Sequence, residues 1–127
     1  MKYLLDTSTF LWAATNPGRL SRKARRLCES PKETLVVSAA SLWEIAIKCD
    51  VGGLRIADPP RSLPDWLARL GARILPIEAT HAYALHGLPP IHRDPFDRIL
   101  VAQAITEDLP LVTCDERIQQ YPARWVW

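Results

Sequence analysis

Four acidic side chains occupy positions that favour a metal site. Asp6 and Asp115 each follow a short apolar run typical of a buried strand, Glu44 lies in a helical stretch, and Asp97 heads the apolar face of another helix. Crowded carboxylates raise one another's pKa, and a hard divalent cation relieves their repulsion. If the four converge, Mg²⁺ or Mn²⁺ held between them would activate water and stabilise the charge developing on a phosphodiester.

Three of these acids also have a structural interpretation that needs no metal. Asp6 and Asp115 are placed to cap the helix or turn that follows their strands, and for a single aspartate that role is the commoner one. Glu44 has Lys48 four residues further along the chain, and this spacing alone favours a surface ion pair. The metal hypothesis therefore depends on the acids meeting in space.

Asp94 and Asp97 stand at the start of the same predicted helix but favour different roles. Asp94 precedes Pro95, a residue preferred at the first helical position, so we expect Asp94 to be the N-cap. Asp97 falls in the first turn, where the helix dipole favours an acid. Its neighbours Leu100 and Val101 are apolar, however, and docking of that face would desolvate the carboxylate and raise its pKa. We favour a functional role for Asp97.

Strand-like and helical segments alternate along the chain. Apolar runs predict strands over 3–5, 35–37, 73–77 and 110–113, with an edge strand over 125–127. Helical periodicity or capping signals predict helices over 7–14, from about 21, and over 39–48, 63–70, 80–86 and 95–108. This alternation predicts an α/β fold with a central parallel sheet flanked by helices on both faces. No linker or repeat interrupts it, so we expect a single domain, 1–127.

The composition is that of an ordinary globular domain. A chain of 127 residues can bury a core without disulfides or zinc, and its net charge of +2 neither demands nor excludes a nucleic-acid partner. The three cysteines lack metal-ligand spacing, and we expect small buried residues in a reducing compartment. No signal peptide and no apolar run of membrane-spanning length is found, which predicts a cytoplasmic protein with no membrane association.

Four segments, in this order, resemble motifs of the PIN-domain nucleases, and within them the VapC-type toxins of toxin–antitoxin pairs. The strongest match runs over residues 92–104. It consists of His-Arg-Asp-Pro-Phe-Asp-Arg, followed at the family's spacing by Leu100 and then by Ala102-Gln103-Ala104. The other three are Leu4-Leu5-Asp6-Thr7-Ser8, the segment 38–45 that ends in Glu-Ile, and Thr113-Cys114-Asp115. The resemblance covers nearly the whole chain.

The resemblance implies a metal-dependent RNA endonuclease that acts as the toxin of a toxin–antitoxin pair. It implies that Mg²⁺ or Mn²⁺ is bound by Asp6 and Asp97, and that the catalytic set comprises Asp6, Glu44, Asp97 and Asp115. Auxiliary roles, such as orienting carboxylates or waters, fall to Thr7, Ser8, Thr113 and, beside its capping role, Asp94. The implied partners are RNA, a cognate antitoxin protein and a second copy of the chain in a homodimer.

Other conspicuous side chains carry weaker signals. Arg93 and Arg98 flank the acids and are candidates for phosphate contact, although Arg98 is equally suited to pair with an active-site acid. His92 lies in the motif, but we favour a structural hydrogen bond for this loop histidine. Trp12 and Trp43 fall in predicted helices beside apolar residues, which favours the core or a dimer interface over base stacking.

Two other functions are compatible with a small α/β chain that carries an acidic site. A phospho-acceptor receiver domain has similar length and an acidic Mg²⁺ pocket, but it carries paired acids after its first strand and a lysine after its last. Here Thr7 follows Asp6, and no lysine follows Lys48, which argues strongly against a receiver. A PIN-like binding module without catalysis is the second alternative, and the intact set of acids argues against it.

Overall fold

The structure, a computed structural model, describes residues 1–127 and contains one five-stranded parallel sheet of order β3-β2-β1-β4-β5. The strands are β1 (Lys2–Leu5), β2 (Thr34–Ser38), β3 (Arg73–Leu75), β4 (Leu111–Val112) and β5 (Trp125–Val126). The α-helices are α1 (Thr7–Thr15), α2 (Arg22–Glu29), α3 (Ala39–Asp50), α4 (Pro59–Leu70), α5 (Ala79–Ala84) and α6 (Pro95–Thr106). Short 3₁₀ turns are η1 (Pro17–Arg19), η2 (Leu85–Gly87) and η3 (Ile118–Gln120).

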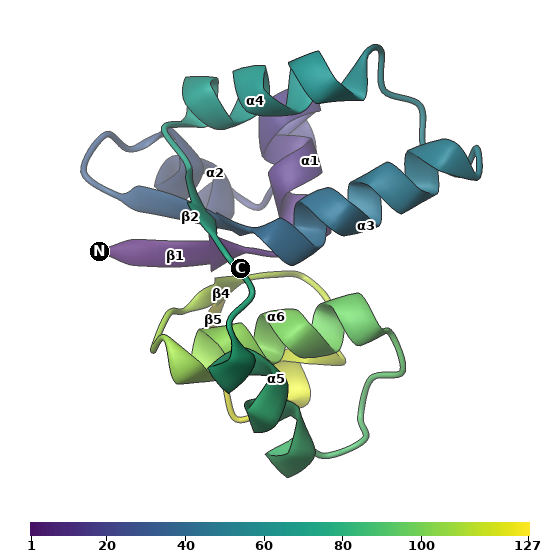
Figure 1. Cartoon of the computed structure of the whole chain (residues 1–127). Helices are drawn as coiled ribbons and strands as arrows, with labels where there is room; N and C mark the ends of the chain where they lie inside the picture. The colour runs from purple at the N-terminus through teal and green to yellow at the C-terminus, as the bar shows by residue number, and fades with distance from the viewer.

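The sheet separates two apolar clusters. Successive strand residues point to opposite faces, so Leu5 packs in the cluster that contains Phe10 of α1, whereas Leu4 packs in the one that contains Leu100 of α6. Figure 1 shows α1 to α4 on one side of the sheet and α5 and α6 on the other. The predicted α/β fold, with a parallel sheet and helices on both faces, is confirmed.

The strand order places a change of direction beside β1. The chain passes outward from β1 to β2 and β3, then returns to the other side of β1 for β4 and β5. Ligand sites of parallel α/β sheets lie at such a switch point, beyond the carboxyl ends of the strands. Asp6 follows β1 directly and Asp115 lies three residues after β4, so the fold brings these two chain segments to that point.

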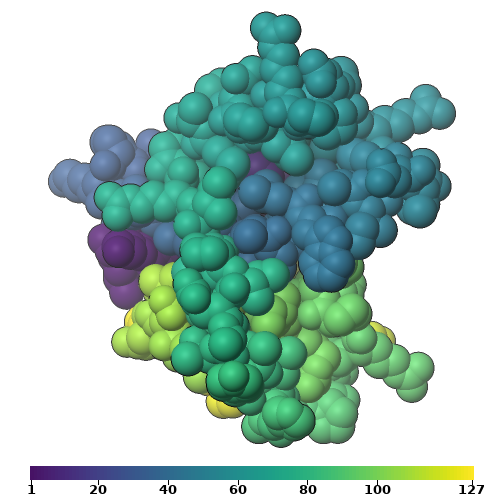
Figure 2. All heavy atoms as spheres, in the orientation of Figure 1, coloured from purple at the N-terminus to yellow at the C-terminus, as the bar shows by residue number.

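One segment links the two layers at the edge of the sheet. In the space-filling view the stretch from β3 to α5, coloured teal to green, runs down the front of the molecule (Figure 2). His81 of α5 is fully buried there, and its Nδ1 accepts a hydrogen bond from the backbone N–H of Glu78 at 2.9 Å. No helix has both the length and the apolar character required to cross a bilayer.

Several element bounds differ from the sequence prediction, and proline accounts for two of these differences. The helix expected over 63–70 begins at Pro59, because Pro59 and Pro60 occupy the first turn, where backbone N–H groups have no helical partner. The strand expected over 73–77 ends at Leu75, before Pro76. The helix expected to reach residue 108 ends at Thr106, because Asp108 adopts a left-handed φ of 53°.

Candidate active site

A polar pocket of about 260 Å³ lies beyond the carboxyl ends of β1 and β4. We call it the acid pocket, and its lining residues are Asp6, Thr7, Ser8, Glu44, Lys48, Asp94, Asp97, Cys114 and Asp115. The four acids identified in the sequence, which come from four different segments, therefore face one space. Five carboxylates and one lysine leave this pocket with an excess of negative charge.

Asp6 combines a cap with a place in the pocket. Its Oδ1 accepts a hydrogen bond from the backbone N–H of Thr9 at 2.8 Å, which makes it the N-cap of α1. Burial raises the pKa of this carboxyl above its ordinary value, although hydrogen bonds involving Thr113 and Thr9 oppose the shift. Only 5% of the residue is exposed. Asp6 caps α1 and also lines the acid pocket, so its structural and functional interpretations are compatible.

Glu44 is buried, contrary to the surface pair that its spacing favoured. The residue is 4% exposed, because the helix that carries it, α3, packs against both α1 and α6. Lys48 Nζ donates to Glu44 Oε2 at 2.6 Å, and this hydrogen bond raises the pKa of the lysine. Glu44 Oε1 is buried with no hydrogen-bond partner. A buried carboxylate oxygen without a partner is strongly disfavoured unless a cation reaches it.

The two aspartates of α6 have different surroundings. Asp94 Oδ1 accepts from the backbone N–H of Phe96 at 2.8 Å, so its predicted role as N-cap is confirmed. Asp97 points into the pocket with 17% of its side chain exposed. Burial, together with the nearby charge of Asp94, raises the pKa of Asp97 to about 7, although His92 acts in the opposite direction. A carboxyl with such a pKa is only about half ionised at neutral pH, and a nearby cation would favour its charged form.

Asp115 is held by hydrogen bonds on both oxygens. Its Oδ1 accepts from the backbone N–H groups of Arg117 at 2.8 Å and Ile118 at 3.3 Å. Its Oδ2 lies 3.1 Å from Nε2 of His92. Burial would raise the pKa of Asp115, but the hydrogen bonds from His92 and the two backbone groups outweigh burial and lower it. Asp115 therefore supplies a stable negative charge at the mouth of the pocket.

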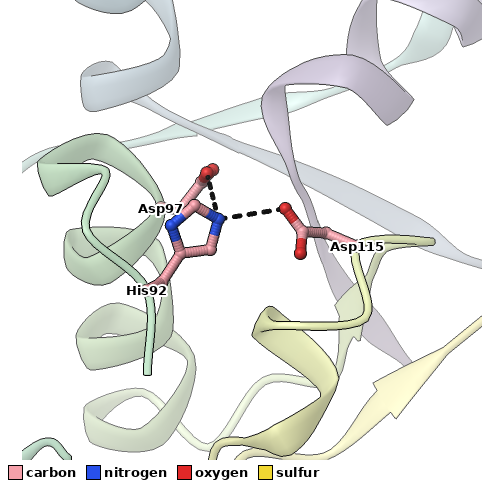
Figure 3. Close-up of side chains that lie close together, drawn as sticks. All are labelled: His92, Asp97 and Asp115. Atoms are coloured by element: carbon pink, nitrogen blue, oxygen red, sulfur yellow. Dashed lines mark hydrogen bonds and ion pairs between the residues drawn. The ribbon is translucent and has the colours of Figure 1, made fainter. Parts of the chain in front are cut away.

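His92 joins two acids that come from separate elements. Its Nε2 lies 3.0 Å from Asp97 Oδ2 and 3.1 Å from Asp115 Oδ2, as Figure 3 shows. One donor atom from each of these three residues falls within 4.8 Å of the others, the spacing of a metal site. The structural hydrogen bond expected of His92 is present, because its Nδ1 accepts from the backbone N–H of Asp94, but its place between the two acids was not predicted. The position of His92 within the acid-rich motif was the only available signal.

The auxiliary residues divide into two groups. Thr7 Oγ1 donates to Ser41 Oγ at 2.8 Å and so ties α1 to α3, while Thr113 Oγ1 accepts from the backbone N–H of Asp115 at 3.0 Å. Ser8 lines the pocket and is exposed. Cys114 also lines the pocket and is exposed, whereas Cys28 and Cys49 are partly buried. The expectation of three buried cysteines is therefore wrong, although all three thiols are free.

The two arginines that are candidates for phosphate contact differ in exposure and in hydrogen bonding. Arg93 is exposed and is next in the chain to Asp94, which lines the pocket. Arg98 is not part of the pocket lining, because its Nη1 donates to the carbonyl oxygen of Pro89 at 3.0 Å and to the hydroxyl of Tyr121 at 3.1 Å. The alternative pairing of Arg98 with an active-site acid does not occur.

An acid-lined pocket at the switch point of a small parallel sheet defines a class of α/β protein suited to holding a divalent cation. The chain belongs to the PIN-domain family, whose model matches residues 3–124. It is 34% identical over 123 residues to Ribonuclease VapC22 of Mycobacterium tuberculosis, an alignment that covers 93% of this chain and 90% of the relative.

Solved structures of similar fold come from VapBC complexes. VapBC2 from Rickettsia felis, bound to a DNA fragment from its promoter, matches with a TM-score of 0.75 at 18% identity and covers 99% of this chain and 98% of that one. VapBC-1 from nontypeable Haemophilus influenzae matches with a TM-score of 0.65 at 20% identity and covers 99% and 97%. These likenesses establish the fold.

Proposed function

We propose that this protein is a metal-dependent RNA endonuclease and the toxin of a VapC-type toxin–antitoxin pair, with residues 1–127 acting as one domain. The observation that carries the proposal is the convergence of carboxylates from four chain segments on one pocket, in which Glu44 Oε1 is buried without a partner. The likeness to a ribonuclease, 90% of which is covered by the alignment, supports RNA as the substrate.

The donor set fits Mg²⁺ or Mn²⁺. Carboxylate oxygens are the preferred ligands of both ions, and Asp6 and Asp97 are the ligands we propose, with Glu44 and Asp115 completing the negative site. A cation bound there would activate a water molecule and stabilise the charge that develops on the scissile phosphodiester. It would also relieve the repulsion that raises the pKa of Asp97.

The remaining residues position the substrate and the acids. Exposed Arg93 is placed to contact an RNA phosphate at the pocket rim, a role for which its forked guanidinium is well suited. Lys48 compensates one oxygen of Glu44 and leaves the other without a partner. Thr7 and Thr113 hold the segments that carry Asp6 and Asp115 through their hydroxyl hydrogen bonds.

The ends of the RNA products test this proposal. Purified protein should cleave single-stranded RNA in Mg²⁺ or Mn²⁺ and leave a 5′-phosphate and a 3′-hydroxyl, because an activated water attacks phosphorus and the ribose 2′-hydroxyl takes no part. Treatment of the products with a 5′-phosphate-dependent exonuclease provides the measurement. Products that end in a 2′,3′-cyclic phosphate would rule out hydrolysis at this site.

An antitoxin would act on the same pocket. The excess of acids suits an arginine or lysine side chain from the partner, which would compete with the metal for Asp97 and its neighbours. The two proteins should therefore co-purify, and the complex should cleave RNA at no more than a few per cent of the rate of the free toxin. Full nuclease activity in a stable stoichiometric complex would contradict this mode of inhibition. We therefore expect the protein to act in the cytoplasm, together with its RNA substrate and its antitoxin.

We also infer a homodimer. Trp43 is 60% exposed and Ile77 43% exposed, and with Phe96 they border a mainly apolar hollow of about 260 Å³ on the α3–α6 surface. Exposed aromatic and aliphatic side chains that share one hollow are typical of a subunit interface. Sedimentation equilibrium of the free protein, compared with Trp43→Ser, would measure the association directly.

A further inference from the structure

His92 is fixed in the site from two directions. Its backbone N–H donates to the hydroxyl of buried Tyr121 at 2.8 Å, and its ring Nδ1 accepts from the backbone N–H of Asp94 at 3.1 Å. Only 11% of the side chain is exposed. The ring is therefore anchored before any ligand enters, and it presents Nε2 toward the two aspartates in Figure 3.

The contact at Nδ1 determines which ring nitrogen carries the proton. An N–H group of the backbone can only donate, so Nδ1 must offer its lone pair and the ring proton sits on Nε2. The Nε2–H group then donates to Asp115 Oδ2 and lies 3.0 Å from Asp97 Oδ2. In this tautomer Nε2 has no lone pair for a metal, which makes His92 a donor to the acids and not a ligand beside them.

Asp97 and Asp115 need such a donor because nothing else links them. Asp97 belongs to α6 and Asp115 to the loop after β4, and each carries a negative charge that repels the other once ionised. The backbone N–H groups of Arg117 and Ile118 donate to Oδ1 of Asp115. These local hydrogen bonds do not fix the position of Oδ2. A single N–H between the two carboxylates opposes their separation.

We propose that His92 is the positioning residue of the acid pocket: its Nε2–H group, oriented by the backbone N–H of Asp94, holds Asp97 and Asp115 at the separation that receives a divalent cation. This inference rests on the proposed metal-dependent function and specifies how the two carboxylates are kept together before a cation binds. Residues that orient metal ligands by hydrogen bonding typically contribute about 10- to 100-fold to metal affinity. Asp94 then acts twice, through its side chain as a helix cap and through its backbone as the group that sets the histidine tautomer.

Two amide variants that differ by one methylene test the proposal. In His92→Gln the Nε2–H₂ group extends to the reach of the histidine Nε2 and can still donate to the acids, whereas the amide of His92→Asn ends near the position of Nδ1 and falls short. His86→Asn is the matched control, because His86 is exposed and lies outside the pocket. Binding of Mn²⁺ to the full chain without RNA, followed by the EPR signal of the free ion, gives the dissociation constant of each protein.

We expect His92→Asn to weaken Mn²⁺ binding by about 10- to 100-fold, and His92→Gln and His86→Asn to remain within about threefold of the parent. Saturating Mn²⁺ should restore RNA cleavage by His92→Asn to within about fivefold, so that the loss lies in metal affinity and little in kcat. If His92→Asn fails to fold, His92→Gln alone decides. An Mn²⁺ affinity of His92→Gln equal to that of the parent would support the proposal, and a loss of Mn²⁺ affinity in this variant would overturn it.

Pulsed EPR of bound Mn²⁺ separates the donor role from direct ligation. We expect no ¹⁴N coupling from a coordinated imidazole in the parent protein, and such a coupling that disappears in His92→Asn would make His92 a ligand and overturn the proposal. Equal Mn²⁺ affinity in His92→Asn and the parent would also overturn it. If the parent binds Mn²⁺ with this dependence on His92 and yet never cleaves RNA, the positioning role stands and the proposed nuclease function fails.

Discussion

Replacement of Asp97 by asparagine is expected to lower RNA cleavage by at least about a thousandfold. The ionisation of Asp97 depends on a nearby cation, because burial and the charges of Asp94, Glu44 and Asp6 all raise its pKa. Asparagine keeps the shape but removes the charge, so the site loses a ligand, and the several kcal/mol that a bound cation contributes to the transition state correspond to about three orders of magnitude in rate. Single-turnover cleavage of a fluorescent RNA at saturating Mn²⁺ measures this loss.

The matched control is the same substitution three residues earlier. Asp94→Asn should cleave within about fivefold of the parent rate, because asparagine is as good an N-cap as aspartate and the backbone N–H that contacts His92 is unchanged. Circular dichroism should report an unchanged fold in both variants. Normal cleavage by Asp97→Asn, together with a much lower melting temperature than the parent, would make Asp97 a structural acid of the first helical turn.

The metal-free protein is expected to lose stability as the pH rises from 5 to 8. The pKa of Asp97 is about 7 in the folded chain and 3.8 as the ordinary value, so the folded state binds more protons than the unfolded state between these values. The stabilising contribution is complete below pH 4 and disappears as the pH rises through 7. It amounts to about 2–4 kcal/mol, since each pKa unit corresponds to about 1.4 kcal/mol.

Other acids in the pocket do not cancel this slope. Burial also raises the pKa of Asp6, which adds to the loss of stability at higher pH. The lowered pKa of Asp115 acts in the opposite direction but only below about pH 4, where that carboxyl begins to protonate. Urea unfolding in EDTA at pH 5.5 and pH 8 provides the measurement, with Asp97→Asn as the variant in which the slope should decrease. A parent protein that is more stable at pH 8 than at pH 5.5 without metal would contradict the raised pKa of Asp97.

The sequence contained enough information for the architecture because its signals are local. The apolar run before Asp6, the Asp94-Pro95 helix start and the alternation of strands with helices each depend on neighbours within a few residues. The sheet order that follows from this alternation is then restricted by the rules of parallel α/β folds. Strand and helix ends were less accurate, since prolines at 59, 60 and 76 shifted them by two to four residues.

The details of the site depend on contacts between distant residues, and local patterns do not encode these. The Glu44–Lys48 pair was visible as an i,i+4 spacing, but the burial of Glu44 results from the packing of α3 against α6. His92 meets Asp115 across 23 residues of sequence, and its tautomer depends on one backbone N–H. Arg98 and Arg93 are equivalent in the motif, yet only Arg98 donates a hydrogen bond to the hydroxyl of Tyr121, which lies 23 residues further along the chain.

The most direct test of a metal-dependent nuclease at the acid pocket is a single Mn²⁺ titration read in two ways. Protein freed of metal with EDTA and desalted is titrated with Mn²⁺ while bound ion and the initial rate of RNA cleavage are measured in the same samples. We predict no cleavage before the first addition and a rate that rises in proportion to the bound ion, with both signals lost in Asp97→Asn. Cleavage that persists in EDTA, or that saturates independently of Mn²⁺ binding and survives in Asp97→Asn, would contradict the central claim.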